Sequence, residues 1–171
     1  MDMSREILDF YCGGQDDQGR TLDEILAWPN MELEVVHDFI QWLFPLTERS
    51  GANPSAPILD RETIAAFHAS EELRDRLRQS FLRMLRFYGL EFHSEKIQLA
   101  QSFAARSSNW LTPGNHNHLR LTRILRSLRL LGLESESQAL FRALSQLYES
   151  HPGRITFKTY EFWKNASETP W

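Results

Sequence analysis

The residues best suited to hold a ligand occur in two short segments of the sequence. The first segment contains Gln41 and Trp42, where an amide and an indole N–H that both need hydrogen-bond partners stand side by side. The apolar helical face around them is already supplied by Phe39, Ile40 and Leu43. We therefore predict that Gln41 and Trp42 line a pocket, and the alternative is that both pack in the core.

The second segment begins with Asn117, Arg120 and Arg123, which lie three residues apart at the start of an expected helix. Residues at this spacing can share one surface, and the N-terminus of a helix attracts anions. The pattern predicts a site for a carboxylate or a phosphate, with Arg126 as a further candidate. The alternative is that these arginines pair with the acidic N-terminal helices.

A positively charged face for nucleic acid is the alternative function that the sequence suggests. Residues 74–129 carry eleven basic groups against three acidic ones, whereas residues 1–73 carry four against fifteen. Trp110 could stack on a base beside this arginine-rich face. The isoelectric point of about 5.9 argues against it, because nucleic-acid-binding domains often exceed about 9. A solvated face held by salt bridges is the competing interpretation.

Histidine and cysteine residues give no pattern typical of a catalytic or metal site. A helix would point His116 and His118 about 200° apart, so shared metal ligation would need distant partners. His37 and His118 would indicate an enzyme only if they converged on a carboxylate in an open pocket. Both stay candidates for ligand binding. Cys12 is the single cysteine and is expected to be a small buried residue. We predict that the protein is not an enzyme and holds no cofactor or metal ion.

Composition and helical periodicity predict an all-α protein. Hydrophobic residues make up 42% and charged residues 25% of 171 residues, which is typical of one globular domain over residues 1–171. Apolar runs are far shorter than the roughly 20 residues of a membrane-spanning helix. We expect a single compact bundle of about seven or eight helices. Two predicted short helices follow the caps Thr21 and Asp60, and a last helix starts at Thr156. Longer helices are predicted over residues 32–43, 71–88, 95–105, 117–131 and 135–149. Turns are expected over residues 107–116, and Ser135 with Gln138 forms a capping-box pattern.

Several blocks of the sequence resemble one family. Residues 37–46, His-Asp-Phe-Ile-Gln-Trp-Leu-Phe-Pro-Leu, are similar to the Tyr-Ile-Gln-Trp-Leu-Phe-Pro-Leu stretch of the opioid growth factor receptor conserved region. Residues 10–11 resemble its early Phe-Tyr pair, residues 87–89 its Phe-Tyr-Gly, and residues 117–128 its Asn-Leu-Arg-Ile-Thr-Arg-Ile-Leu-Lys-Ser-Leu block. The collinear resemblance covers residues 7–150.

The resemblance implies a receptor-like, non-catalytic binding module. Eukaryotic members of the family are nuclear-envelope-associated receptors for an enkephalin peptide, and the resemblance transfers no catalytic residue. We expect an unknown protein or peptide partner, bound in a pocket between the helix of Trp42 and the helix of residues 117–126. The arginine-rich, lysine-poor usage and the compact length suggest a short stand-alone bacterial member, and hence a cytoplasmic protein.

Overall fold

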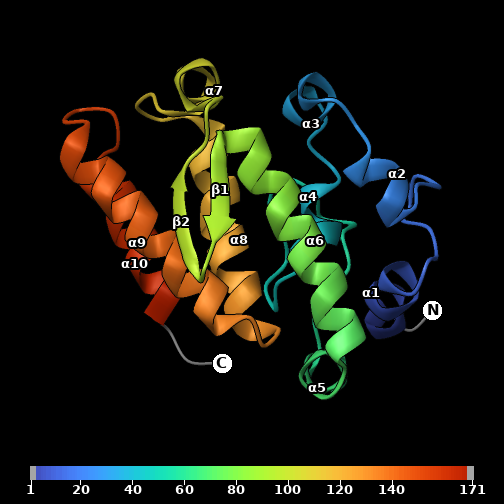
Figure 1. Ribbon diagram of the computed structural model, residues 1–171. Helices are drawn as coiled ribbons and strands as arrows, with labels where there is room; N and C mark the ends of the chain where they lie inside the picture. The colour runs from blue at the N-terminus through green and yellow to red at the C-terminus, as the bar shows by residue number, and fades with distance from the viewer. Residues whose placement is uncertain (1–2, 169–171) are drawn as a thin grey trace. The chain divides into compact units, whose positions relative to one another are not determined.

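The computed structural model describes residues 3–168, and the chain divides into two compact units. The first unit extends to Ser80 and the second begins at Phe81, while helix α6 (Glu71–Tyr88) continues from one into the other. Within residues 3–168 there are ten helices and one two-stranded sheet (Figure 1). The predominantly helical fold class is therefore confirmed, although the helices outnumber the seven or eight expected. The single domain over residues 1–171 stays a prediction.

The first unit consists of short helices whose starts follow from local capping. Thr21 and Glu24 form the reciprocal hydrogen bonds of a capping box, and Asp60 accepts a hydrogen bond from the Thr63 N–H over 2.7 Å. Helices α1 and α5 pack against each other. The helices before α6 are α1 (Met3–Tyr11), α2 (Leu22–Leu26), α3 (Asn30–Val35), α4 (Ile40–Leu43) and α5 (Arg61–Ala69).

The predicted helix over residues 32–43 is wrong, because the chain breaks between α3 and α4. Val36 is extended, with φ −88° and ψ 130°. Arg20 stabilises the segment between the two helices. Its Nη1 donates to Asp38 Oδ1 over 2.9 Å, and its Nε donates to the buried Asp16 over 2.7 Å. Asn53 Nδ2 donates to the Asp38 carbonyl over 3.4 Å. These long-range contacts override an apolar spacing that is compatible with a continuous helix.

The second unit is a group of helices with a β-hairpin beside it. Helices α8, α9 and α10 pack against one another, and strand β2 packs beside α9 (Figure 1). Its interior contains large side chains from these elements, among them Trp110, Leu121, Leu140 and Trp163. The elements are β1 (Leu90–His93), β2 (Lys96–Leu99), α7 (Phe103–Trp110), α8 (His116–Leu130), α9 (Glu134–Ser150) and α10 (Phe157–Glu168).

The predicted helix over residues 95–105 is also wrong, because its first half is strand β2. Gly89 ends α6 with φ +79°, as expected of a helix terminator, and its carbonyl accepts from the Ala100 N–H over 2.9 Å. The hairpin turn consists of Ser94 and Glu95, with φ +47° and +63°. Helix α7 then occupies part of residues 107–116, where we expected turns.

Helix α9 begins without the capping box that the sequence suggested. We expected Ser135 to cap the helix, with Gln138 three residues later. The helix instead starts at Glu134 after Leu133, and no side chain caps it. The side chains of Ser135 and Gln138 are instead exposed on the surface of the helix.

Candidate binding site

Gln41 and Trp42 lie inside the first unit. Each has 3% of its surface exposed, and the Trp42 ring meets Phe10 edge to face at 5.4 Å. Gln41 Nε2 donates to the carbonyl of the exposed His37 over 3.3 Å. Gln41 Oε1 and Trp42 Nε1 are buried with no hydrogen-bond partner among the described residues. The contact with Phe10 agrees with core packing, and a pocket at these residues stays a prediction.

The polar start of α8 is buried rather than open. Asn117 and Arg120 are both buried, and Arg120 Nη1 donates to Asn117 Oδ1 over 3.5 Å. The three-residue spacing therefore brings these two side chains together, as expected. Arg123 and Arg126 are half-buried on the same helix. Anion binding by these residues stays a prediction, as does a pocket shared with Trp42, which belongs to the other unit.

His118 and Trp110 form part of the interior of the second unit. His118 Nε2 is 2.8 Å from the Trp110 carbonyl, and Trp163 Nε1 donates to the His118 carbonyl over 3.0 Å. Burial lowers the pKa of His118, although its hydrogen bond to the Trp110 carbonyl opposes this. Trp110 is fully buried and donates from Nε1 to the Tyr88 carbonyl over 3.0 Å. The expected stacking role of Trp110 is wrong, because neither of its ring faces is exposed.

Four arginines outside this interior form ion pairs with nearby acidic side chains, so the salt-bridged interpretation holds for them. Arg76 pairs with Asp23 over 2.8 Å and Arg129 with Glu134 over 2.7 Å. The other two pairs are Arg74 with Glu71 and Arg78 with Asp75. Each of these side chains is already neutralised within its own unit or helix, which reduces the positive charge that a polyanion would meet.

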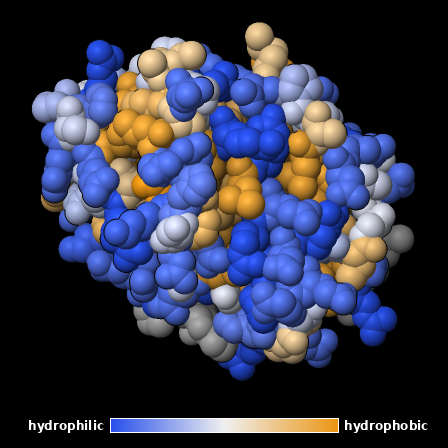
Figure 2. Space-filling model, viewed as in Figure 1, coloured by the Kyte–Doolittle hydropathy of each residue, from blue (hydrophilic) through white to orange (hydrophobic). Residues whose placement is uncertain are grey.

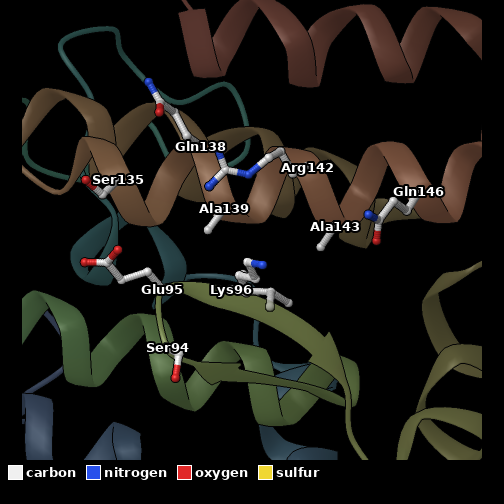
Figure 3. A pocket seen from close by; sticks show the side chains of 10 residues that line it. Ser94, Glu95, Lys96, Ser135, Gln138, Ala139, Arg142, Ala143 and Gln146 are labelled. Atoms are coloured by element: carbon white, nitrogen blue, oxygen red, sulfur yellow. The ribbon is translucent and has the colours of Figure 1, made fainter.

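A groove of about 420 Å³ lies between the hairpin and helix α9 (Figure 3). The hairpin contributes its turn and the start of β2, and the helix contributes the face that carries Ala139 and Ala143. The ten residues that line it are Ser94, Glu95, Lys96, Ile97, Ser135, Gln138, Ala139, Arg142, Ala143 and Gln146. None of the ten was predicted as a site residue, since they come from two distant segments and include no specific motif.

Two features of the sequence create this groove. Ala139 and Ala143 are one helical turn apart, and their small side chains leave space where larger residues would fill the contact with the hairpin. The turn of Ser94 and Glu95 brings Lys96 back towards α9, and in Figure 3 Lys96 lies opposite the stretch that carries the two alanines. The pair of small residues was the only sequence feature that could have suggested the groove.

Polar groups able to donate hydrogen bonds dominate the lining. They are the Lys96 ammonium, the Arg142 guanidinium, two amides and two hydroxyls, and Glu95 is the one carboxylate among the ten residues. Lys96, Arg142 and Glu95 form no ion pair with the described residues. A second hollow of about 330 Å³ shares Gln138 and Arg142 with the groove. The arrangement can bind a ligand that carries hydrogen-bond acceptors.

The face seen in Figure 2 is mainly hydrophilic, and smaller hydrophobic areas are separated by hydrophilic side chains. In the second unit, large apolar side chains with more than half of their surface exposed include Leu99, Leu119 and Phe157, which belong to three different elements. Separate exposed apolar residues are normal on soluble surfaces. We therefore place the candidate site in the polar groove. Within residues 3–168, no helix combines the length and apolar character needed to cross a membrane.

The fold and the groove define a predominantly helical protein with a polar, ligand-sized site. The family model described as "Opioid growth factor receptor (OGFr) conserved region" matches residues 4–166. The chain belongs to this family.

The chain is similar to several vertebrate proteins. It is 43% identical to the opioid growth factor receptor of Mus musculus over 113 residues, covering 64% of this chain and 18% of that protein. It is 35% identical to opioid growth factor receptor-like protein 1 of Xenopus tropicalis over 133 residues, covering 75% of this chain and 26% of that protein. The chain thus spans about a quarter or less of these relatives. No solved structure matches the chain.

Proposed function

We propose that this chain is a non-catalytic binding module that takes a peptide segment of a partner protein in the groove between β2 and α9. The groove carries this proposal because its volume of about 420 Å³ lies within the range of about 300–1,000 Å³ that is typical of ligand sites. Several relatives are named receptors, which supports a protein or peptide partner. The vertebrate relatives do not support the predicted bacterial origin, and that origin and a cytoplasmic location stay predictions.

The edge of the sheet favours a peptide over a compact small molecule. The sheet has only two strands, and β2 packs beside α9 on the side away from β1 (Figure 1). The bond between the Ala100 N–H and the Gly89 carbonyl sets the register, so Phe92 and Ile97 form a pair without mutual hydrogen bonds. The main-chain N–H and C=O of Ile97 therefore point away from β1. Ile97 lines the groove, so its N–H and C=O are on the side of β2 that faces α9, where they can hydrogen-bond to main-chain groups of a peptide seated in the groove.

Selection from a displayed library of random dodecapeptides tests the proposal. Peptides that bind the protein should lose binding to Ala143→Phe, which fills the groove, and to Gln146→Trp, which crowds it from an exposed position. Ala105→Phe on the exposed surface of α7 is the matched control and should leave binding unchanged. Thermal unfolding of each variant shows that the fold is intact.

Peptides that bind all variants equally would place the binding site elsewhere and contradict the proposal. Failure to select any peptide would also contradict it. Nucleic-acid binding is the alternative outcome: it would weaken steeply as salt is raised from 50 to 200 mM, and the double charge reversal Arg78→Glu with Arg126→Glu should abolish it.

A further inference from the structure

We propose that the groove between β2 and α9 recognises a carboxylate of the bound peptide, held between Lys96 and Arg142. This inference rests on the proposed peptide-binding function and specifies the chemistry of its ligand. The carboxylate can come from an acidic side chain or from a free C-terminus, since both present the same two oxygens.

The charges of the lining favour a monoanion. Lys96 and Arg142 supply two positive charges and Glu95 supplies one negative charge, so the groove carries one net positive charge. A single carboxylate matches this balance, whereas the second charge of a phosphate would be repelled by Glu95. The guanidinium can donate two parallel hydrogen bonds to a carboxylate.

Lys96 and Arg142 are both available for a ligand, because the described part of the second unit supplies neither with a counter-ion. Neither Lys96 nor Arg142 forms an ion pair or a side-chain hydrogen bond with the described residues. Arg129, in the last turn of α8, shows the contrast, because it is held by Glu134 and by the Ser167 carbonyl. Binding a carboxylate at Lys96 and Arg142 therefore breaks no ion pair among residues 3–168.

The remaining polar groups fit the rest of such a peptide. Gln138 and Gln146 also line the groove from α9, four residues before and four residues after Arg142. In Figure 3 the Arg142 side chain extends towards Gln138, while Lys96 approaches from the hairpin. Amide groups can pair with main-chain N–H and C=O groups on either side of the carboxylate.

Four defined probes test the inference with the ¹⁵N-labelled full chain by amide chemical-shift titration. They are acetylated and amidated hexaglutamate, acetylated and amidated hexaglutamine, acetylated hexaglutamine with a free C-terminus, and inorganic phosphate. We expect shifts at the groove with hexaglutamate, with the free-C-terminus peptide, or with both, which identifies the source of the carboxylate. The amidated hexaglutamine should bind at least about tenfold more weakly, as expected when a charge-assisted hydrogen bond is lost.

Charge variants separate groove recognition from general attraction. The double variant Lys96→Gln with Arg142→Gln should weaken binding of the carboxylate probe by at least about tenfold. The control, Arg154→Gln with Lys164→Gln, removes the same two residue types from exposed positions outside the groove and should change binding less than twofold. Glu95→Gln should strengthen binding about two- to fivefold, a gain that unfolding cannot produce.

The outcomes distinguish this inference from the function on which it rests. Equal binding of both amidated peptides, equal loss in the two double variants, or tighter binding of phosphate than of either carboxylate probe would overturn carboxylate recognition. Groove binding by library-selected peptides would in that case still support the proposed function. If neither selected nor defined peptides bind, the proposed function fails together with the inference.

Discussion

The indole of Trp163 donates a hydrogen bond from Nε1 to the main-chain carbonyl of His118 over 3.0 Å, and the two rings meet edge to face at 5.4 Å. This contact joins α10 to the first turn of α8 in the interior of the second unit. Only 3% of the His118 surface is exposed there. His118, a ligand-binding candidate on α8, thus contributes to the packing of α8 against α10, and ligand binding by the α8 candidates stays a prediction.

Replacing Trp163 by Phe should lower the free energy of unfolding by about 2 kcal/mol. The substitution removes a buried donor, leaves the His118 carbonyl without this partner and opens a small cavity. Urea denaturation followed by circular dichroism measures the change. Phe162→Leu, at an exposed position of the same helix, should change stability by less than about 0.5 kcal/mol. Equal stability of both variants would show that the bond contributes little.

Because of His118, the free energy of unfolding should decrease as the pH is lowered from about 6.5. Its Nε2 approaches the Trp110 carbonyl and must carry the proton, while Nδ1 is buried with no hydrogen-bond partner among the described residues. Burial therefore lowers the pKa of His118 in the folded state below its usual value of 6.5. The unfolded chain then binds more protons, so the stabilisation is fully present above pH 6.5 and is lost as the pH falls through the folded-state pKa.

Denaturation curves between pH 8 and pH 5 measure this dependence. His118→Gln should flatten the slope below pH 6.5, because the titrating group is gone. His93→Gln, an exposed histidine on β1, is the comparison and should keep the slope of the parent protein. If the free energy of unfolding of the His118→Gln variant still depends on pH in the same way, other groups cause the dependence and the prediction is wrong.

Replacing Tyr11 by Phe should cost about 1–2 kcal/mol. The Tyr11 hydroxyl is buried in the first unit, donates to the Leu43 carbonyl over 2.5 Å and lies 3.2 Å from Ser80 Oγ. Burial raises the pKa of this hydroxyl well above its usual value, so it stays a donor at alkaline pH. Tyr160→Phe, a half-buried tyrosine in the second unit, serves as control in thermal unfolding. A larger loss in the control would contradict the expectation.

Replacing Gly89 by alanine should destabilise the protein much more than replacing Gly114 by alanine. Both have positive φ, +79° and +68°. A Cβ at Gly89 would lie 2.7 Å from the Cα of Phe103, whereas a Cβ at Gly114 meets nothing within 4 Å. Gly89→Ala should therefore cost about 3 kcal/mol or more and Gly114→Ala about 1 kcal/mol. Calorimetric unfolding of both variants measures the difference, and similar losses would contradict the close approach of α7 to the end of α6.

The long helices could be predicted because their apolar spacing and caps agree with the packing. The predicted helices over residues 71–88, 117–131 and 135–149 correspond to α6, α8 and α9 within one residue at each end. Residues 95–105 could not be predicted in this way. Their apolar residues fit a helix and an alternating strand equally, and the turn of Ser94 and Glu95 lacks the Gly or Asn that usually indicates a hairpin.

The candidate site was less predictable than the fold. Gln41 and Trp42 were selected because their polar groups need partners, and Asn117 because of its spacing from the arginines at a helix start. The structure places all three side chains in the interior. The groove instead uses residues whose types are ordinary on a surface. Its two walls are about 40 residues apart in the sequence, and only the hairpin that was not predicted brings Lys96 to α9.

Photo-crosslinking tests most directly whether the groove between β2 and α9 is the binding site. Library-selected peptides carrying a benzophenone group are irradiated with the protein, and mass spectrometry identifies the residues that are crosslinked. We predict crosslinks within residues 94–97 and 135–146 that disappear in the Ala143→Phe variant. Crosslinks concentrated within residues 37–42 or 117–126, and unchanged by Ala143→Phe, would contradict the account.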